Sequence, residues 1–422
     1  MTEEVRTQAR DVAAPPKCRL CSSPLAHTFV DLGASPLANS YLEPSQLDGG
    51  EPFYPLHVRV CDQCLLVQLP MLAAPGEIFS EYAYFSSYSD SWVDHARRYV
   101  ETVAERFDLD GSSQVVELAS NDGYLLQFFQ SRGVRALGIE PAANVAAAAK
   151  ERGIDTVVDF FGERLALELL EQGLTADLIV GNNVLAHVPD VHDFVEGIRR
   201  LLKPDGVVTM EFPHLLRLIE ERQFDTIYHE HFSYFSLGSA QRLFAAHGLV
   251  IFDVEQLPTH GGSLRVYAGH EAAPHRREAA VDELEATERE AGLDDLGTYL
   301  RFDETARAAK RDLLAFLIEA KRAGKQIAAY GAAAKGVTLL NFCGVGGDFI
   351  DYVVDRSPHK QGRFLPGVRL PILAPEHVAE TRPDVLLILP WNLGREIAEQ
   401  MAFVRSWGCE LVVPIPEVSV LG

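Results

Sequence analysis

Two short cysteine pairs are the residues of this chain whose type and spacing most directly predict chemistry. Cys18 and Cys21 form one CxxC pair, Cys61 and Cys64 form the other, and 39 residues separate them. Each pair can offer two thiolates from one tight turn, so together they suit a tetrahedral zinc site. Disulfides or free thiols are less expected, because both pairs repeat one spacing in a chain with cytosolic features. Four cysteines fill every position around the ion, which predicts structural zinc and places the reaction elsewhere.

The segment around residue 230 holds four titratable side chains in a row: Tyr228, His229, Glu230 and His231. A histidine is the natural proton acceptor at neutral pH, a neighbouring carboxylate can orient it, and a tyrosine can donate to a developing enolate oxygen. If the segment is extended, Tyr228 and Glu230 share one face, whereas a turn can bring all four together. There are two alternatives. One is a metal site, but the spacing is not HExxH and no third ligand is evident, and the other is a buried network of hydrogen bonds. We favour a catalytic role. His187 is expected at the mouth of this site, with a structural role as its alternative.

The elements that must position these residues alternate between strands and helices after a predicted helix at 91–107. This alternation predicts a doubly wound α/β domain. Its expected strands are 114–120, 134–141, 155–161, 176–187 and 206–213, with helices at 144–153 and 191–204 among the segments between them.

The turn after the first of these strands is poor in glycine. Gly123 is present, but Ala119 and Asn121 stand where a glycine-rich loop would have glycine. Asparagine tolerates left-handed backbone angles, so the turn can form, yet it is a poor cradle for pyrophosphate. The loop suits a cofactor without phosphate, and neither a GxGxxG nor a GxxxxGK[ST] loop is present for NAD or ATP.

Polar and aromatic residues end the following strands. Glu140 ends the second strand, 23 residues after Glu117, where an acid can accept both ribose hydroxyls of an adenosine group. Phe160 ends the third strand, where adenine would lie. A solvated strand end for Glu140 and a core position for Phe160 are the alternatives. The pattern predicts S-adenosylmethionine on a class I methyltransferase fold. The expected cofactor site comprises Glu117, Ala119, Asn121, Gly123, Glu140, Pro141, Asp159, Phe160, Asn182 and Ser87.

A second α/β alternation begins at residue 325, after long helices expected over 271–322. Residues 330–336 predict a strand, a turn and a helix start that carries Lys335, and the loop 355–362 adds Lys360. Helix N-terminal amides with an ammonium form an anion site that suits the pyrophosphate of a sugar nucleotide. Tight packing by the small residues is the alternative. Trp391 and Asn392 follow a later strand at the same edge of the sheet, where ligands bind.

Composition excludes several classes of protein. The chain has 422 residues, 47% of them hydrophobic, and a net charge of −22, which disfavours nucleic acids and anionic membranes. The polar N-terminal residues predict no signal peptide, and no apolar run predicts a membrane span. Cys343 and Cys409 lie outside the pairs and are expected to be buried thiols. We expect a cytoplasmic protein.

The chain as a whole resembles the sugar C-methyltransferases that act on nucleotide-linked 4-keto deoxysugars. The resemblance rests on CRLC and CDQC, ELASNDG, DTIYHEHF, THGGSLRVY, YGAAAKG with NFCG, and DRSPHKQG with PWN. It implies three domains, with zinc in the first, S-adenosylmethionine in the second, and a TDP-sugar in the cleft facing the third. It also implies His231 as the base, assisted by Glu230 and Tyr228, with Tyr82 and His187 lining the site. The implied substrate-binding residues are Lys335, Lys360, Trp391, Asn392 and His260.

The expected reaction is therefore methyl transfer from S-adenosylmethionine to a carbon next to the C-4 ketone of a TDP-linked 4-keto deoxysugar. C-3 is favoured, C-5 is possible, and a base generates the enolate. A small-molecule O- or N-methyltransferase and a non-enzymatic zinc scaffold that binds partner proteins are the alternatives. We expect a monomer with a role in deoxysugar and antibiotic biosynthesis. The expected division is a flexible tail at 1–16, a zinc-binding domain at 17–80, a methyltransferase domain at 81–268, a helical connection at 269–322 and a sugar-nucleotide-binding domain at 323–422.

Overall fold

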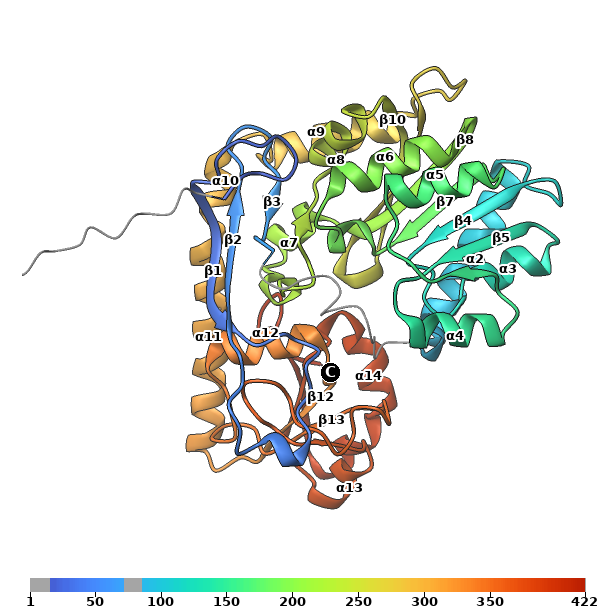
Figure 1. Ribbon diagram of the computed structural model, residues 1–422. Coiled ribbons are helices and arrows are strands. Elements are labelled where there is room, and N and C mark those ends of the chain that lie inside the picture. The colour runs from blue at the N-terminus through green and yellow to red at the C-terminus, as the bar shows by residue number, and fades with distance from the viewer. Residues whose placement is uncertain (1–15, 72–85, 422) are drawn as a thin grey trace, which may run out of the picture.

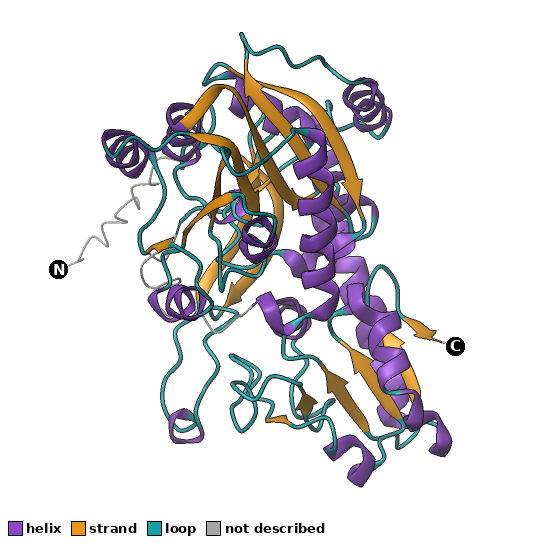
Figure 2. Ribbon diagram, turned by 90° about the vertical axis from the view of Figure 1, so that its right-hand side faces the viewer, coloured by secondary structure: helices purple, strands orange, loops and turns teal. Residues whose placement is uncertain are grey.

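The computed structural model describes residues 16–71 and 86–421, whose strands form three separate sheets (Figure 1). A four-stranded sheet belongs mainly to the N-terminal part, a seven-stranded sheet to the middle and a six-stranded sheet to the C-terminal part. Helices cover the faces of the two larger sheets (Figure 2). This arrangement confirms the predicted α/β class with three parts.

The seven-stranded sheet has the order β6-β5-β4-β7-β8-β11-β10. The first five strands in this order are parallel, β11 is antiparallel to β8, and β10 is antiparallel to β11. The chain order reverses between β4 and β7, and ligands of such sheets bind at the carboxyl ends of the strands at this point. The strands are β4 (Gln114–Leu118), β5 (Arg135–Ile139), β6 (Thr156–Val157), β7 (Ala176–Asn182), β8 (Leu202–Pro213), β10 (Leu249–Leu257) and β11 (Ser263–His270).

Two helical layers bury the faces of this sheet. One apolar core joins it to α2, α3 and α4, and a second core joins its other face to α5, α6, α8 and α9. Helix α6 shows why such segments are helical: Val191, Phe194, Ile198 and Leu201 are buried at helical spacing, and the Asp190 carboxylate caps its first amides. The helices are α2 (Asp90–Arg106), α3 (Leu126–Ser131), α4 (Ala143–Glu151), α5 (Glu163–Glu171), α6 (Val191–Leu201), α7 (Leu215–Glu220), α8 (Leu237–Ala245) and α9 (Ala279–Glu290).

The N-terminal sheet does not stand alone. Its antiparallel strands run in the order β1-β2-β3-β9, and β9 comes from the middle of the chain, directly after the predicted catalytic segment 228–231. Buried residues of β1 and β2 share one core with α11 and with α12 (Ala334–Cys343), and the two strands run along α11 in Figure 1. The bounds are β1 (His27–Ser35), β2 (Tyr54–Val60), β3 (Val67–Gln68), β9 (Ser233–Tyr234), α10 (Leu296–Leu300) and α11 (Phe302–Arg322).

The C-terminal sheet has the order β14-β13-β12-β15-β16-β17. All of its pairs are parallel except β16 with β17, so the carboxyl ends of β12 and β15 meet at one edge. The predicted alternation of strands and helices after residue 325 is present, and two short strands, β14 and β17, lie at the edges of the sheet. The bounds are β12 (Ile327–Tyr330), α12 (Ala334–Cys343), β13 (Val353–Val354), β14 (Ile372–Leu373), α13 (His377–Thr381), β15 (Val385–Ile388), α14 (Gly394–Gln400), β16 (Glu410–Val413) and β17 (Ser419–Leu421).

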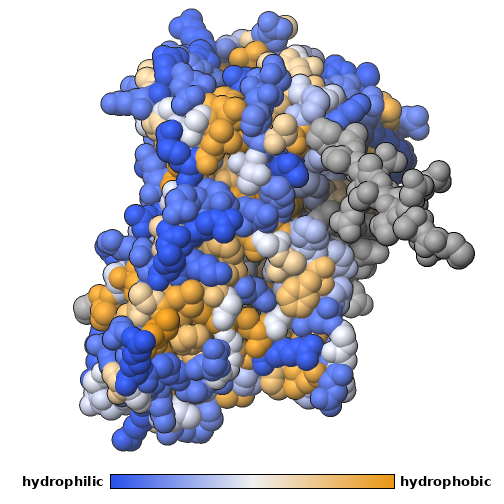
Figure 3. Space-filling view, turned by 90° about the vertical axis from the view of Figure 1, so that its left-hand side faces the viewer, coloured by the Kyte–Doolittle hydropathy of each residue, from blue (hydrophilic) through white to orange (hydrophobic). Residues whose placement is uncertain are grey.

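The surface fits the composition of the chain. The face shown in Figure 3 is mostly hydrophilic, with apolar groups scattered across it. Within residues 16–71 and 86–421, no helix is long and apolar enough to cross a membrane. All but the last residue of the predicted tail 1–16, the predicted boundary at residue 80 and Tyr82 lie within 1–15 and 72–85, outside the described residues.

Candidate active site and metal centre

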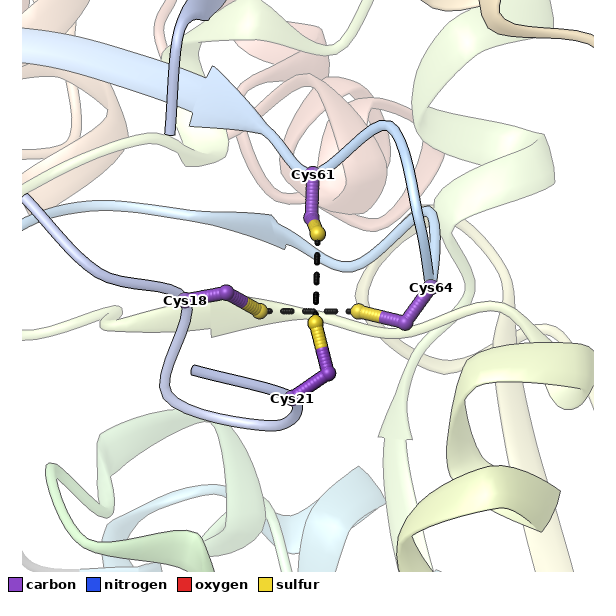
Figure 4. A group of neighbouring side chains, drawn as sticks. All are labelled: Cys18, Cys21, Cys61 and Cys64. Atoms are coloured by element: carbon purple, nitrogen blue, oxygen red, sulfur yellow. Dashed lines mark hydrogen bonds between the residues drawn. The ribbon is translucent and has the colours of Figure 1, made fainter. Parts of the chain in front are cut away.

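The four cysteines of the two CxxC pairs, each pair called a knuckle below, converge on one point (Figure 4). Their sulfur atoms all lie within 4.8 Å of one another, and the pairs Cys18–Cys64 and Cys21–Cys61 are 3.5 Å and 3.4 Å apart. Zinc–sulfur bonds of about 2.3 Å in a tetrahedron would separate the sulfurs by about 3.8 Å. The predicted set of four ligands therefore fits a zinc ion, with no position left for water.

Polar groups around the knuckles favour thiolates. The Gln68 side chain donates from Nε2 to the Cys18 sulfur at 3.1 Å, and the Gln63 amide donates to the Cys61 sulfur at 3.4 Å. Because metal-bound sulfur is anionic, these donors are a suitable second layer.

A cavity of about 760 Å³ lies where the three parts of the chain meet. It is bounded by the carboxyl ends of β4, β5 and β7, by the turn that holds His231, and by the first residues of α12. Fourteen predicted site residues line it: Ala119, Asn121, Glu140, Pro141, Asp159, Phe160, Asn182, His187, Tyr228, His231, His260, Lys335, Lys360 and Asn392.

The turn after β4 forms without a glycine-rich sequence. Ala119, Asn121 and Gly123 all have left-handed backbone angles, with φ of 55°, 50° and 77°. Gly123 is required for a second reason, because a Cβ there would lie 2.7 Å from the Ile154 side chain. Gly123 therefore shapes the turn but does not line the cavity, whereas Ala119 and Asn121 do.

Glu140 is buried, so the solvated strand end is wrong for this residue. Its carboxylate accepts hydrogen bonds from the backbone amides of Asn121 at 2.9 Å and Ala142 at 2.8 Å. Burial raises the pKa of Glu140, and these two hydrogen bonds oppose the rise. Each carboxylate oxygen keeps a lone pair beyond these contacts. The group lies in the cavity wall and can accept the hydroxyls of a ribose.

The adjoining wall suits the rest of an adenosyl cofactor. Phe160 is 46% exposed at the cavity, so the alternative of a core position is wrong. Asn183 donates from Nδ2 to His260 Nε2 at 3.1 Å, while its Oδ1 is buried with no hydrogen-bond partner among the described residues. This unpaired oxygen of Asn183 can accept a hydrogen bond from an N–H group of a bound cofactor. The residues present therefore fit S-adenosylmethionine.

Two predicted cofactor residues lie behind the wall. Glu117 is fully buried in β4, where burial and the charges of Glu140 and Asp122 raise its pKa. The Ser87 hydroxyl donates to Asp122, and Ser86 lines the cavity in its place.

The segment around residue 230 is a tight turn, not an extended strand. The His231 amide donates to the Tyr228 carbonyl at 2.9 Å, which brings the first and fourth residues of the turn together. Their rings lie 4.0 Å apart, and the His187 ring lies 4.7 Å from His231. The turn therefore brings two of the predicted catalytic side chains, Tyr228 and His231, into the cavity wall, where His187 lies beside them.

The His231 ring has a defined tautomer. Nδ1 lies 2.8 Å from the Thr226 carbonyl, which can only accept, so Nδ1 carries the proton and Nε2 carries a lone pair. Burial lowers the pKa of His231 well below its ordinary value, and the charges of His187, His260 and Lys335 add to this effect. At neutral pH the ring is therefore a neutral proton acceptor.

The two middle residues of the turn point away from the cavity. Glu230 accepts from the Asn39 side chain at 2.6 Å, and burial raises the pKa of Glu230 to about 7. His229 donates to the Pro55 carbonyl at 3.2 Å. We expected the Glu230 carboxylate to contact the base and orient it, and this is wrong. The Thr226 carbonyl contacts the His231 ring instead, and Glu230 bonds to Asn39.

The C-terminal lobe adds two lysines to the wall. Lys335 donates to the side chain of Asn392 at 3.0 Å, and Lys360 donates to the Ala332 carbonyl at 2.8 Å. The predicted residue Trp391 does not line the cavity. Its indole instead lies behind Lys335, with the ammonium 4.6 Å from the ring centroid.

The sequence pattern did not single out Asn39 and Tyr41, two cavity residues from the N-terminal part. The Tyr41 hydroxyl donates to the Ala332 carbonyl at 2.6 Å, across 291 positions of sequence. Neither residue stands in a motif of its own, and only the long-range packing of β1 and β2 on the C-terminal lobe brings them here.

Comparisons with known proteins agree with this arrangement. Family models match residues 18–79 as a putative zinc binding domain, 91–254 as a methyltransferase domain and 258–416 as a C-methyltransferase C-terminal domain. The C-methyltransferase NovU of Streptomyces niveus is 39% identical over 416 residues, which are 98% of each chain. A ubiquinone biosynthesis O-methyltransferase of Rhodopseudomonas palustris is 22% identical over 152 residues, or 31% of this chain and 60% of the relative.

Solved methyltransferase structures overlap with part of the chain. The magnesium protoporphyrin IX methyltransferase of Synechocystis, at 14% identity, covers 43% of this chain and 82% of its own with a TM-score of 0.32. The C-methyltransferase NovU matches across all three parts of this chain, including the cysteine cluster and the cavity. The chain belongs to the C-methyltransferase family, with zinc in its N-terminal part and S-adenosylmethionine as its methyl donor.

Proposed function

We propose that this protein methylates a carbon next to the C-4 ketone of a TDP-linked 4-keto deoxysugar, with C-3 favoured and C-5 possible. The observation that carries the proposal is the position of His231. This neutral base lines one cavity together with the ligand-binding edges of two α/β sheets. Carbon methylation needs a base to remove a C–H proton, and a two-lobed cavity can hold donor and acceptor side by side. We further propose that the enzyme acts as a cytoplasmic monomer.

The two lobes would divide the ligands between them. S-adenosylmethionine would lie against the β4, β5 and β7 ends, held by Glu140 and the left-handed turn at Ala119 and Asn121. The sugar nucleotide would lie against the C-terminal lobe, where Lys360 and the N-terminus of α12 can take its pyrophosphate. Asn39 and Tyr41 close the cavity from the N-terminal part.

The reaction would begin at Nε2 of His231. The ketone acidifies the neighbouring C–H group, and Nε2 takes its proton while the C–H electron pair becomes the new carbon–carbon double bond of an enolate. Tyr228, packed on the same ring, can donate to the enolate oxygen. S-adenosylmethionine, when bound, would supply the electrophilic methyl group for the enolate carbon, and its sulfur would keep the electron pair of the broken sulfur–methyl bond. The protonated His231 then returns its proton to solvent.

Incubation with a labelled methyl donor and a panel of TDP-4-keto deoxysugars tests this function. We expect label in the sugar, and product analysis should place the new methyl group on carbon. Label on oxygen or nitrogen would favour the alternative small-molecule methyltransferase. A folded protein that binds no S-adenosylmethionine by calorimetry would favour the scaffold.

Glu140→Ala is expected to weaken S-adenosylmethionine binding by about 1.5–3 kcal/mol, the usual contribution of hydrogen bonds to a charged group. The loss arises because the variant has no acceptor for the ribose hydroxyls. Calorimetric titration measures it, and Glu151→Ala, at an exposed glutamate at the end of α4, is the matched control. Equal affinity in folded Glu140→Ala and wild type would contradict the assignment.

A further inference from the structure

Lys335 occupies an unfavourable position for a cation. It lies in the first turn of α12, where the helix dipole presents its positive end. Burial lowers the pKa of its ammonium to about 8. A neutral side chain at this position would avoid both the burial of a charge and the repulsion from the helix dipole. A lysine here therefore indicates a role in the chemistry of the cavity.

The ammonium is held in place but is not saturated. It donates to Asn392 Oδ1 at 3.0 Å and to the His260 carbonyl at 3.2 Å, and it lies over the Trp391 ring. An ammonium has three N–H donors, and the third has no hydrogen-bond partner within the described parts of the chain. Because Lys335 lines the cavity, this third donor is available to a ligand.

Asp225 is the nearby counter-charge. Its Oδ2 accepts from the Trp391 indole at 2.7 Å, while its buried Oδ1 has no hydrogen-bond partner in the described ranges. The charge of Asp225 opposes the burial effect on the pKa of Lys335. The ammonium also lowers the pKa values of two neighbouring histidines, His231 and His260. Both histidines are neutral near pH 7, so Asp225 is the group that sustains the cation.

The second lysine of the wall has different surroundings. Lys360 donates to the Ala332 carbonyl, lies 3.7 Å from the Asp355 carboxylate and contacts the Tyr41 ring at 5.4 Å. It stands beside the turn that leads into α12, where a phosphate would benefit from the helix N-terminus. The two lysines therefore suit two different negative charges. Lys360 suits the pyrophosphate, and Lys335 suits a charge that develops near the base.

We propose that Lys335 is a catalytic residue that stabilises the enolate, and that Asp225 is a positioning residue that keeps it charged. This inference deepens the proposed function and rests on it. As His231 takes the proton from carbon, the ketone π electrons move to oxygen, and Lys335 donates a hydrogen bond to that oxygen while remaining protonated. Tyr228 is then the second, uncharged donor.

Lys335→Met removes the charge while keeping the length of the side chain. We expect about a 10²–10³-fold loss of kcat, the effect of removing one donor to an oxyanion, with a much smaller change in KM for the sugar nucleotide. Exchange of the substrate α-proton with deuterated solvent should slow equally. In the matched variant Lys360→Met, KM should rise about tenfold or more while kcat changes less. If Lys335→Met instead raises KM and leaves exchange at the wild-type rate, Lys335 binds phosphate and the inference is overturned.

The pH profile tests the pair without replacing the lysine. The charged form exists below its pKa, so wild-type kcat/KM should fall as pH rises through about 8. The charge of Asp225 raises that pKa, so Asp225→Asn should move the fall to lower pH. An unmoved profile would overturn the positioning role. If wild type neither exchanges the α-proton nor methylates carbon, the proposed function fails with this inference, whereas normal exchange in Lys335→Met overturns the inference alone.

Discussion

Replacing His231 by asparagine is expected to lower kcat by about 10²–10⁴-fold, the usual contribution of a positioned acid–base group. The asparagine amide can still donate to the Thr226 carbonyl, so the turn should keep its shape. It cannot accept a proton from carbon. Affinity for both ligands should therefore change little, which calorimetry on each ligand checks.

Proton exchange gives the more direct readout, because it reports proton removal without methyl transfer. Wild type should exchange the α-proton of a TDP-4-keto sugar in deuterated solvent, and His231→Asn should not. His229→Asn is the matched control, since that ring points to the Pro55 carbonyl and not into the cavity. If His231→Asn still exchanges the proton at the wild-type rate, another residue is the base, and Tyr228, which also lines the cavity, would be tested next.

The pH dependence of this step follows from burial. The folded protein holds the pKa of His231 well below 6.5, so the base is already neutral at pH 6.5 and should gain nothing as pH rises further. Its activity should fall only when pH drops through that lowered pKa. The fall at alkaline pH expected for Lys335 is therefore separate from the titration of the base.

Short-range patterns predicted much of this molecule. The two CxxC pairs predicted the sulfur cluster because each knuckle is a local turn. Asn121 predicted a left-handed turn because its own backbone preference allows one. Alternating strands and helices predicted the parallel sheets, since such connections leave few other topologies.

Long-range contacts could not be predicted in this way. The bond between Asn39 and Glu230 joins residues 191 positions apart, and no local pattern specifies it. The pairing of β3 with β9 is equally remote, and each of these strands has only two residues. The direction of each side chain in the His231 turn also depended on its packing partners, because the turn itself does not determine whether Glu230 meets the base or Asn39.

The knuckle cysteines also have a structural link to the cavity. Arg19, between Cys18 and Cys21, donates to the Pro189 carbonyl at 3.2 Å and to the Leu69 carbonyl at 2.5 Å. Pro189 lines the cavity in the loop that follows β7. The zinc knuckle therefore holds a segment of the wall through Arg19, and loss of the metal should reach the active site.

Cys18→Ser with Cys61→Ser is expected to abolish binding of one zinc ion per chain and to destabilise the fold. Structural zinc contributes about 10–16 kcal/mol of binding free energy in small zinc-dependent folds, although here β1 and β2 also share the core of the C-terminal lobe. The variant should therefore retain much of its helix content, unfold at a lower temperature and bind S-adenosylmethionine more weakly as the wall loses Arg19. Metal analysis, thermal unfolding and calorimetry measure these effects. The matched control is Cys409→Ser, the same change at a buried thiol outside the cluster, which should leave the metal content unchanged.

Two outcomes would contradict these expectations. Full zinc content in the double variant would show that other residues hold the ion. Normal S-adenosylmethionine affinity in a zinc-free protein would show that the knuckle does not support the cavity.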